Sequence, residues 1–235
     1  MATSGSTDFT ISRDNIIYDV LSLYEVIESG GTPTTNQLAD GNRFLNKTIK
    51  ALQGMGVGLW LNTEVTMTLV VDQESYTLGP SDTTTTDPTT ISKPLEIIEA
   101  RYVDADDLET PMTIISRQEY MDISDKSTSG VPLMLYYDRQ ITNGVMYIWP
   151  TADTANSIKF TAKEQVEDFD AAADNPDFPP EWFRFVTYRL AVDWAPAFGI
   201  SGQKLAELKG LRDEAEWEAE GFDVEDTSVF FGVDA

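Results

Sequence analysis

The sequence predicts an α+β fold: a helical bundle built from N- and C-terminal helices, with an inserted, mostly antiparallel β-domain and an extended C-terminal tail. Apolar residues recur every three or four positions near both ends of the chain and every second position in its middle. With 235 residues, 41% of them hydrophobic, the chain can bury one large core or two modest ones. The predicted parts are 1–60 (bundle, first part), 61–168 (inserted β-domain), 169–222 (bundle, second part) and 223–235 (tail).

Two amphipathic helices are expected near the N-terminus. Ser12 is suited to cap the first, because its hydroxyl can accept a hydrogen bond from a free N–H of the first turn. Gly30 and Gly31 are expected to end this helix, and Thr35 to cap the next one. The two apolar stripes are Ile16, Val20, Leu23, Tyr24 and Ile27, then Leu38, Leu45, Ile49 and Leu52. Gly54-x-Gly56-x-Gly58 follows a helix and precedes a strand, the reverse of a phosphate-binding loop, so it is interpreted as a helix terminator.

The middle of the chain is predicted to form strands. Val65, Met67, Leu69 and Val71 alternate with polar residues, which is typical of a half-buried strand. Further strands are predicted over 95–103, 112–116, 133–139, 145–149 and 158–163. Asn143-Gly144 suits a tight type I′ hairpin turn, and the Thr-rich stretch from Ser81 to Thr90 is expected to be an exposed hairpin tip.

Two helices are expected near the C-terminus. Pro179-Pro180-Glu181 suits a helix start, and the helix from Trp182 to Trp194 is bulky on nearly all sides, which predicts a central position in the bundle. Pro196 and Gly199 are expected to end it. Ser201 opens a final helix, whose apolar side is Leu205, Leu208, Leu211, Ala215, Ala219 and Phe222.

The last ten residues, 226–235, have no helical pattern. They nevertheless hold four apolar residues, Val229, Phe230, Phe231 and Val233, which are the candidate binding residues for a partner protein. The alternative is that Phe230 and Phe231 fold back onto the chain's own core.

Composition excludes the commonest catalytic chemistry. The chain has no Cys and no His, which excludes disulfides, Cys/His zinc sites, thiol nucleophiles and Ser-His-Asp triads. Asp104–Asp107 and Asp168–Asp177 are rich in acids but lack the spacing of a calcium loop, so both are interpreted as solvated loops. We therefore predict no catalytic, cofactor or metal residue. We also expect a soluble protein with no membrane partner, since no apolar run is long enough to span a bilayer.

The net charge of −24 repels the phosphate backbone of DNA. Arg43, Lys47 and Lys50 share one helix face, which is interpreted as a solvated face rather than a nucleic-acid site.

Short sequence strings that together resemble one protein family are spread from about Ser12 to the C-terminus. They are Arg13-Asp14-Asn15-Ile16-Ile17, Leu45-Asn46-Lys47, the Gly-rich close before Leu59-Trp60, Ile115-Ser116-Arg117-Gln118-Glu119-Tyr120, Gly130-x-Pro132, Tyr136-Tyr137-Asp138, Tyr147-Ile148-Trp149-Pro150, and Asp168-Phe169-Asp170 leading to Asp177-Phe178-Pro179-Pro180-Glu181-Trp182. Their order, rather than any single string, resembles the head-to-tail adaptors of short-tailed bacteriophages, also called head-completion or packaged-DNA-stabilising proteins.

The resemblance implies a structural virion protein without catalytic residues. Such a protein would be made in the host cytoplasm and would form a ring of twelve copies under the portal protein at the head-to-tail junction. The ring would extend the DNA channel toward tail or nozzle proteins, DNA would pass without specific binding, and the C-terminal tail would grip the portal. Two alternatives stay open: another tail or baseplate component, or an acidic carbohydrate-active enzyme using paired carboxylates.

Overall fold

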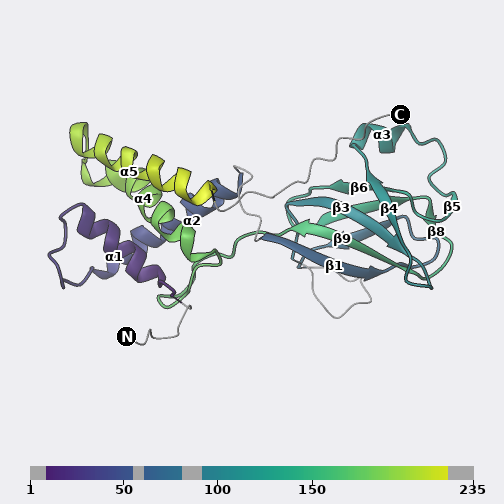
Figure 1. Ribbon diagram of the computed structural model, residues 1–235, viewed down its shortest axis with the longest axis horizontal. Coiled ribbons are helices and arrows are strands. Elements are labelled where there is room, and N and C mark those ends of the chain that lie inside the picture. Colours follow the sequence, from purple (N-terminus) through teal and green to yellow (C-terminus); the bar gives the residue numbers. More distant parts are fainter. Residues whose placement is uncertain (1–8, 55–60, 81–91, 222–235) are drawn as a thin grey trace, which may run out of the picture. The chain divides into compact units, whose positions relative to one another are not determined.

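The computed structural model describes residues 9–54, 61–80 and 92–221. The chain divides into two compact units: a helical unit, formed by residues up to 60 together with residues from 166 onward, and a β unit, formed by residues 61–165. Helices build the first unit and a curled sheet builds the second (Figure 1), which confirms the predicted α+β class. No helix in the described ranges is long and apolar enough to cross a membrane.

Four α-helices form the described part of the helical unit. They are α1 (Arg13–Leu23), α2 (Thr35–Gly54), α4 (Phe183–Trp194) and α5 (Gly202–Glu220), with 3-10 turns at Pro180–Trp182 and Ala195–Phe198. Helix α4 packs against each of the other three, which confirms its predicted central position. Gly199, in the left-handed conformation at φ 69°, ends the turn after α4, and α5 begins after Ser201.

Helix α1 begins as predicted and ends earlier than predicted. The Ser12 hydroxyl accepts a hydrogen bond from the N–H of Asn15. The helix ends at Leu23 rather than at Gly30, because Glu25 takes a left-handed φ of 61° and turns the chain. The buried Tyr24 holds this turn in place by donating its hydroxyl to the Ala191 carbonyl of α4.

The cap of α2 is also displaced from its predicted position. Thr34, not Thr35, makes the capping bonds: its hydroxyl accepts from the Gln37 N–H at 3.3 Å, and the Gln37 side chain accepts from the Thr34 N–H at 2.8 Å. Farther along, Gly41 is buried where α2 meets α1. A Cβ at this glycine would stand 2.7 Å from Ile17, so the close approach of the two helices requires glycine.

Aromatic rings fill the core of the helical unit. Trp194, 2% exposed, contacts Phe198 at a centroid distance of 5.0 Å, Phe44 at 5.9 Å and Tyr24 at 6.3 Å. Tyr24 directly follows α1, Phe44 lies in α2 and Phe198 ends the 3-10 turn after α4, so the Trp194 indole contacts both the N-terminal and the C-terminal part of the helical unit.

The β unit contains a seven-stranded sheet in the order β1-β9-β3-β4-β6-β7-β2. Its strands are β1 (Asn62–Thr68), β2 (Ser75–Leu78), β3 (Glu96–Val103), β4 (Glu109–Ile114), β6 (Met134–Asp138), β7 (Gly144–Trp149) and β9 (Ser157–Lys163). All neighbours are antiparallel except β4 and β6, which are parallel. A small parallel pair, β5 (Ser129–Gly130) and β8 (Thr151–Ala152), stands beside this sheet. The strands β2, β5 and β8, which are short, and the helix α3 (Arg117–Asp122) were not predicted from the spacing of apolar residues.

The predicted type I′ turn at Asn143-Gly144 is wrong. Asp138 pairs with Val145, so the β6–β7 connection is longer than two residues, and Gly144 already belongs to β7. The glycine is required by packing, because a Cβ there would stand 2.0 Å from the Tyr137 hydroxyl. The predicted hairpin tip from Ser81 to Thr90 lies outside the described residues.

Candidate functional site

The chain closes the helical unit where it returns from the β unit. The Phe169 N–H donates to the Asn46 side-chain oxygen at 2.9 Å, and the Asn46 amide donates back to the Phe169 carbonyl at 3.1 Å. Lys50 adds a hydrogen bond of 2.8 Å to the Val166 carbonyl and an ion pair of 2.8 Å with Asp168. Side chains of α2 therefore hold the returning chain mainly by hydrogen bonds to the backbone of that returning chain.

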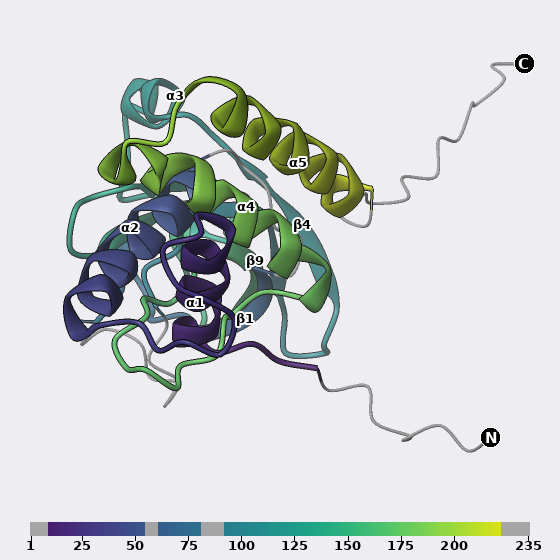
Figure 2. The same cartoon turned by 90° about the vertical axis from the view of Figure 1, so that its left-hand side faces the viewer.

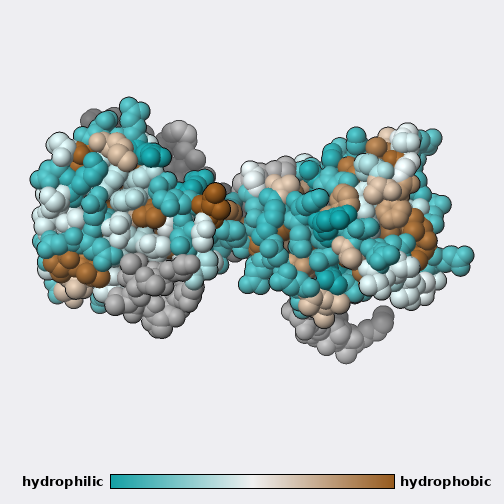
Figure 3. Space-filling model, turned by 180° about the vertical axis from the view of Figure 1, so that it is seen from behind, coloured by the Kyte–Doolittle hydropathy of each residue, from teal (hydrophilic) through white to brown (hydrophobic). Residues whose placement is uncertain are grey.

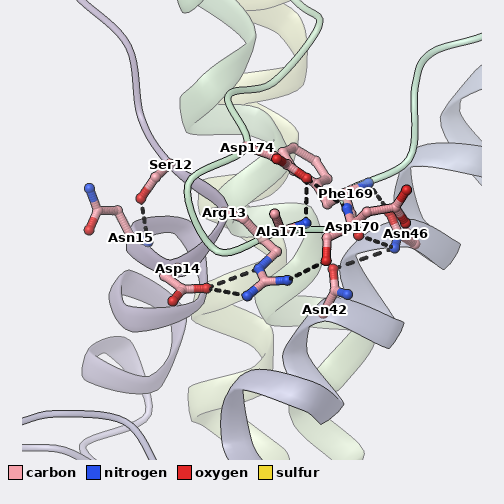
Figure 4. Close-up of polar contacts among 10 residues, drawn as sticks. All are labelled: Ser12, Arg13, Asp14, Asn15, Asn42, Asn46, Phe169, Asp170, Ala171 and Asp174. Atoms are coloured by element: carbon pink, nitrogen blue, oxygen red, sulfur yellow. Dashed lines mark hydrogen bonds and ion pairs between the residues drawn. The ribbon is translucent and has the colours of Figure 1, made fainter. Parts of the chain in front are cut away.

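The start of α1 binds the same returning segment (Figure 4). The Arg13 N–H donates to the Asp174 carbonyl at 3.0 Å, and its guanidinium, paired with Asp14, reaches the Asp170 carbonyl. The Asp174 carboxylate accepts the N–H groups of Ala171 and Asp170, which lowers its pKa. Three strings that carry the resemblance, at Arg13, Asn46 and Phe169, thus meet at one place. The acid-rich stretch 168–177 forms a loop there, which the Asp174 carboxylate stabilises by accepting backbone N–H groups.

Further strings meet in the β unit around three tyrosines. The rings of Tyr120, Tyr136 and Tyr147 lie with centroids between 5.1 and 5.7 Å apart. Tyr120 donates its hydroxyl to Glu74, and burial raises the pKa of this tyrosine. The string before Tyr120 supplies a capping box, in which Ser116 caps α3 and Glu119 returns the bond. These contacts stabilise the β unit itself.

The other acid-rich stretch, Asp104–Asp107, forms the β3–β4 turn. The Asp104 carboxylate accepts the N–H groups of Asp106 and Leu108, each at 2.9 Å. Within the described ranges, no three acidic side chains are grouped so as to hold a metal ion.

The outer face of β9, β3 and β4 carries charges that neutralise one another. Glu109 pairs with Lys159 at 2.7 Å and with Arg101 at 3.2 Å, and Arg101 also approaches Glu99. Lys159 and then Arg101 lower the pKa of Glu109. This face therefore has its charges paired within the chain.

The outward face of α5 is different. Ala206, Gly210, Asp213, Trp217 and Glu220 are spaced four, three, four and three residues apart, are all exposed, and form what we call the α5 outer row. Leu208, Ala215 and Ala219 are the buried residues of this helix and lie on its opposite face. The Trp217 side chain is 77% exposed, although it is among the largest apolar groups in the protein.

Helix α2 exposes a row of opposite charge. Arg43 and Lys47 both lie over the half-buried ring of Phe44, at 5.9 and 5.5 Å from its centroid. We call these three residues the α2 cation patch. Arg43 pairs with the exposed Asp40, whereas no carboxylate of the described residues lies within ion-pair distance of Lys47. The basic face predicted from Arg43, Lys47 and Lys50 is exposed; Arg43 pairs with Asp40 and Lys50 with Asp168.

The α5 outer row was not predicted from the sequence, because the prediction for that helix rested on its apolar stripe alone. The four-three spacing through Trp217 was the available signal. The predicted binding residues Val229, Phe230, Phe231 and Val233 lie outside the described residues. On the face drawn in Figure 3, hydrophobic atoms form separate small patches in a mostly hydrophilic surface.

Comparison with known families identifies the chain. The model of the SU10 adaptor protein family matches residues 16–222, which is most of the sequence. The chain belongs to the SU10 adaptor protein family. It is accordingly a structural adaptor of a phage particle, and its family is one of structural proteins rather than enzymes.

Other comparisons add little to this assignment. No curated protein matches the adaptor. One solved structure, described as the neck of an empty GTA particle with C6 symmetry, is 13% identical and covers 82% of this chain and 88% of its own, with a TM-score of 0.26. At that score the likeness carries no argument about the function of the adaptor.

Proposed function

We propose that this adaptor forms a ring of twelve copies under the portal protein at the head-to-tail junction of the virion, to which it is delivered after synthesis in the host cytoplasm. The ring extends the DNA channel and joins the head to tail or nozzle proteins. The observation that carries this proposal is the family match over residues 16–222. The convergence of the strings around Arg13, Asn46 and Phe169 supports it, because it ties the resemblance to one closed helical unit.

Negative charge suits a channel through which DNA slides without binding. The chain has 40 acids against 16 basic residues. Most of the basic side chains in the described part of the adaptor bond to its own acids or carbonyls. Few cations are therefore free to release counterions from a phosphate backbone. We expect no gel shift of duplex DNA at low salt, where screening is weakest; micromolar affinity would contradict the proposed channel role.

The same charge opposes association of like copies in solution. We therefore expect a monomer in dilute buffer at low salt and a ring only on the portal. Light scattering distinguishes the two states, and a stable ring of the isolated protein would contradict this expectation.

The C-terminal segment 223–235 is proposed as the portal anchor. Full burial of Phe230 or Phe231 would each contribute about 1.5–3 kcal/mol before the cost of ordering the segment. Glu225 and Asp226 suit a basic portal surface and would make docking sensitive to salt.

A truncation tests the anchor on the purified portal ring of the same virus. Deleting Val229 to Ala235 is expected to abolish portal binding and to leave the melting temperature nearly unchanged. The Phe230→Ala/Phe231→Ala variant should reproduce the loss, whereas Ile141→Ala, at a side chain 97% exposed in the β unit, serves as the control and should bind normally. A large fall in melting temperature with binding retained would show that the segment belongs to the core instead.

A further inference from the structure

Three features of α5 are unexplained by its packing within the chain. The first is Gly210, which lies in the middle of the helix, where glycine is less stable than alanine. Nothing lies within 4 Å of the position that a Cβ would occupy there. Unlike Gly41 and Gly144, Gly210 is thus required by no contact within the described part of the chain.

The second feature is Trp217, two turns beyond Gly210 in the same row. Its indole is directed away from the buried seam of α5 and is 77% exposed. Tryptophan is enriched among the residues that contribute most to binding at the centres of protein interfaces.

The third feature is the charge at the C-terminal end of α5. Acids there face the negative end of the helix dipole, where cations are favoured. Arg184 neutralises Glu214 and Glu218, and Arg212 neutralises Asp213. Glu216 and Glu220 have no described cation within ion-pair distance. The end of the helix therefore retains unneutralised negative charge beside Trp217.

The α2 cation patch complements these features. Lys47 supplies an exposed positive charge with no described carboxylate within ion-pair distance, and Arg43 supplies a second one that pairs with Asp40. Both cations can contact the face of an indole. Figure 2 shows α2 and α5 on either side of α4. Arg43 and Lys47 lie opposite the buried residues of α2, and the α5 outer row lies opposite the buried residues of α5. A closed ring requires such a pair of different surfaces, because each copy must contact two neighbours head to tail.

We infer that the α5 outer row of one copy docks on the α2 cation patch of the next copy in the ring. Gly210 permits close approach of the neighbouring helix, Trp217 lies against Arg43 and Lys47, and Glu220 pairs with the cations. This interface rests on the proposed ring. It joins neighbouring copies within that ring and does not involve the proposed portal anchor.

Charge exchange on the purified portal ring of the same virus tests the interface. Lys47→Glu is expected to lower ring occupancy by about tenfold or more, since like charges then face one another. Glu220→Lys in the same chain restores the opposite pairing and should recover most of the occupancy. Arg117→Glu, the same charge change at an exposed site on α3 of the β unit, is the matched control and should assemble as the wild type does. Melting curves of each variant verify that it folds.

A second measurement uses the absence of cysteine from the chain. Lys47→Cys and Glu220→Cys are prepared separately, mixed on the portal ring and oxidised mildly. Disulfide-linked dimers between the two variants are expected. Mixing Thr63→Cys, at an exposed position of β1, with Glu220→Cys should give far fewer.

The outcomes separate the two proposals. Failure of the wild type to form a ring on the portal would overturn both the proposed function and this interface. A normal ring from Lys47→Glu, or a defect that Glu220→Lys leaves unrepaired, would overturn the interface alone. The second result would place the α2 cation patch against another protein, such as the portal.

Discussion

The two units of the adaptor use their polar groups in different ways. In the β unit, the charges on the outer sheet face are paired with one another, as Glu109 is with Lys159 and Arg101. In the helical unit, polar groups close the chain at Asn46, yet α5 leaves Trp217 and Glu220 exposed. A surface whose groups are already paired gains little from a partner, whereas an unpaired one gains contacts on docking. The paired charges of the outer sheet face are thus explained within one chain, whereas Trp217 and Glu220 of α5 are the groups for which we propose a contact between copies.

The strongest test of the comparison uses two tryptophans of the helical unit. Trp194→Ala is expected to lower the free energy of unfolding by about 3–5 kcal/mol, because it empties a site enclosed by three aromatic rings. Trp217→Ala should change it little, since this side chain is 77% exposed. Urea unfolding measures both variants. Equal losses would mean that Trp217 serves the fold and would break the distinction between the two faces of α5.

The closure of the helical unit is tested at Asn46. Asn46→Ala removes both bonds to the Phe169 backbone and should lower the free energy of unfolding by about 1–3 kcal/mol. Asn42→Ala, which loses a single contact of 3.4 Å with Asn46, is the matched control and should cost much less. Similar losses in the two variants would show that the reciprocal bonds do not close the unit.

Glycine substitutions sharpen the assignment of α5. Gly210→Ala is expected to raise the free energy of unfolding by about 0.5–1 kcal/mol, because alanine is the better helix former and the site is open. Gly41→Ala should lower it, since the new Cβ would collide with Ile17. Thermal melts decide the sign. Destabilisation by Gly210→Ala would mean that this glycine serves the fold of the single chain.

The smallest expected effect concerns the paired charges of the β unit. Lys159 and Arg101 lower the pKa of Glu109, so its stabilising effect is present above the ordinary carboxyl range and is lost as the pH falls through the lowered value. Glu109→Gln should lower the melting temperature by about 1–2 °C at neutral pH and by less at about pH 3. Glu64→Gln, on the same face, is the control and should change it less. A pH-independent difference would show that the ion pairs contribute nothing.

Much of the local structure could be predicted from sequence. The α5 seam through Leu208 and Ala215 and the alternation along β9 follow directly from the spacing of apolar residues. Errors arose where packing replaced a local rule. Gly144 suited a turn by its dipeptide, but it lies in β7, where the Tyr137 ring occupies the space that a Cβ would need.

The sequence by itself determined the α+β class, the order of the four long helices and of the longer strands, and the lack of Cys- and His-based chemistry, because periodicity and composition report which faces meet water and which groups exist at all. Only the tertiary structure decided which distant residues meet. The Asn46 side chain and the backbone of Phe169, 123 residues away, exchange two hydrogen bonds. Strand β1, at the start of the β unit in sequence, pairs with β9, at its end. Such contacts depend on how the chain closes over its cores. The four-three spacing through Gly210 and Trp217 marks one face of α5, but it does not show whether that face stays exposed once the closure is complete.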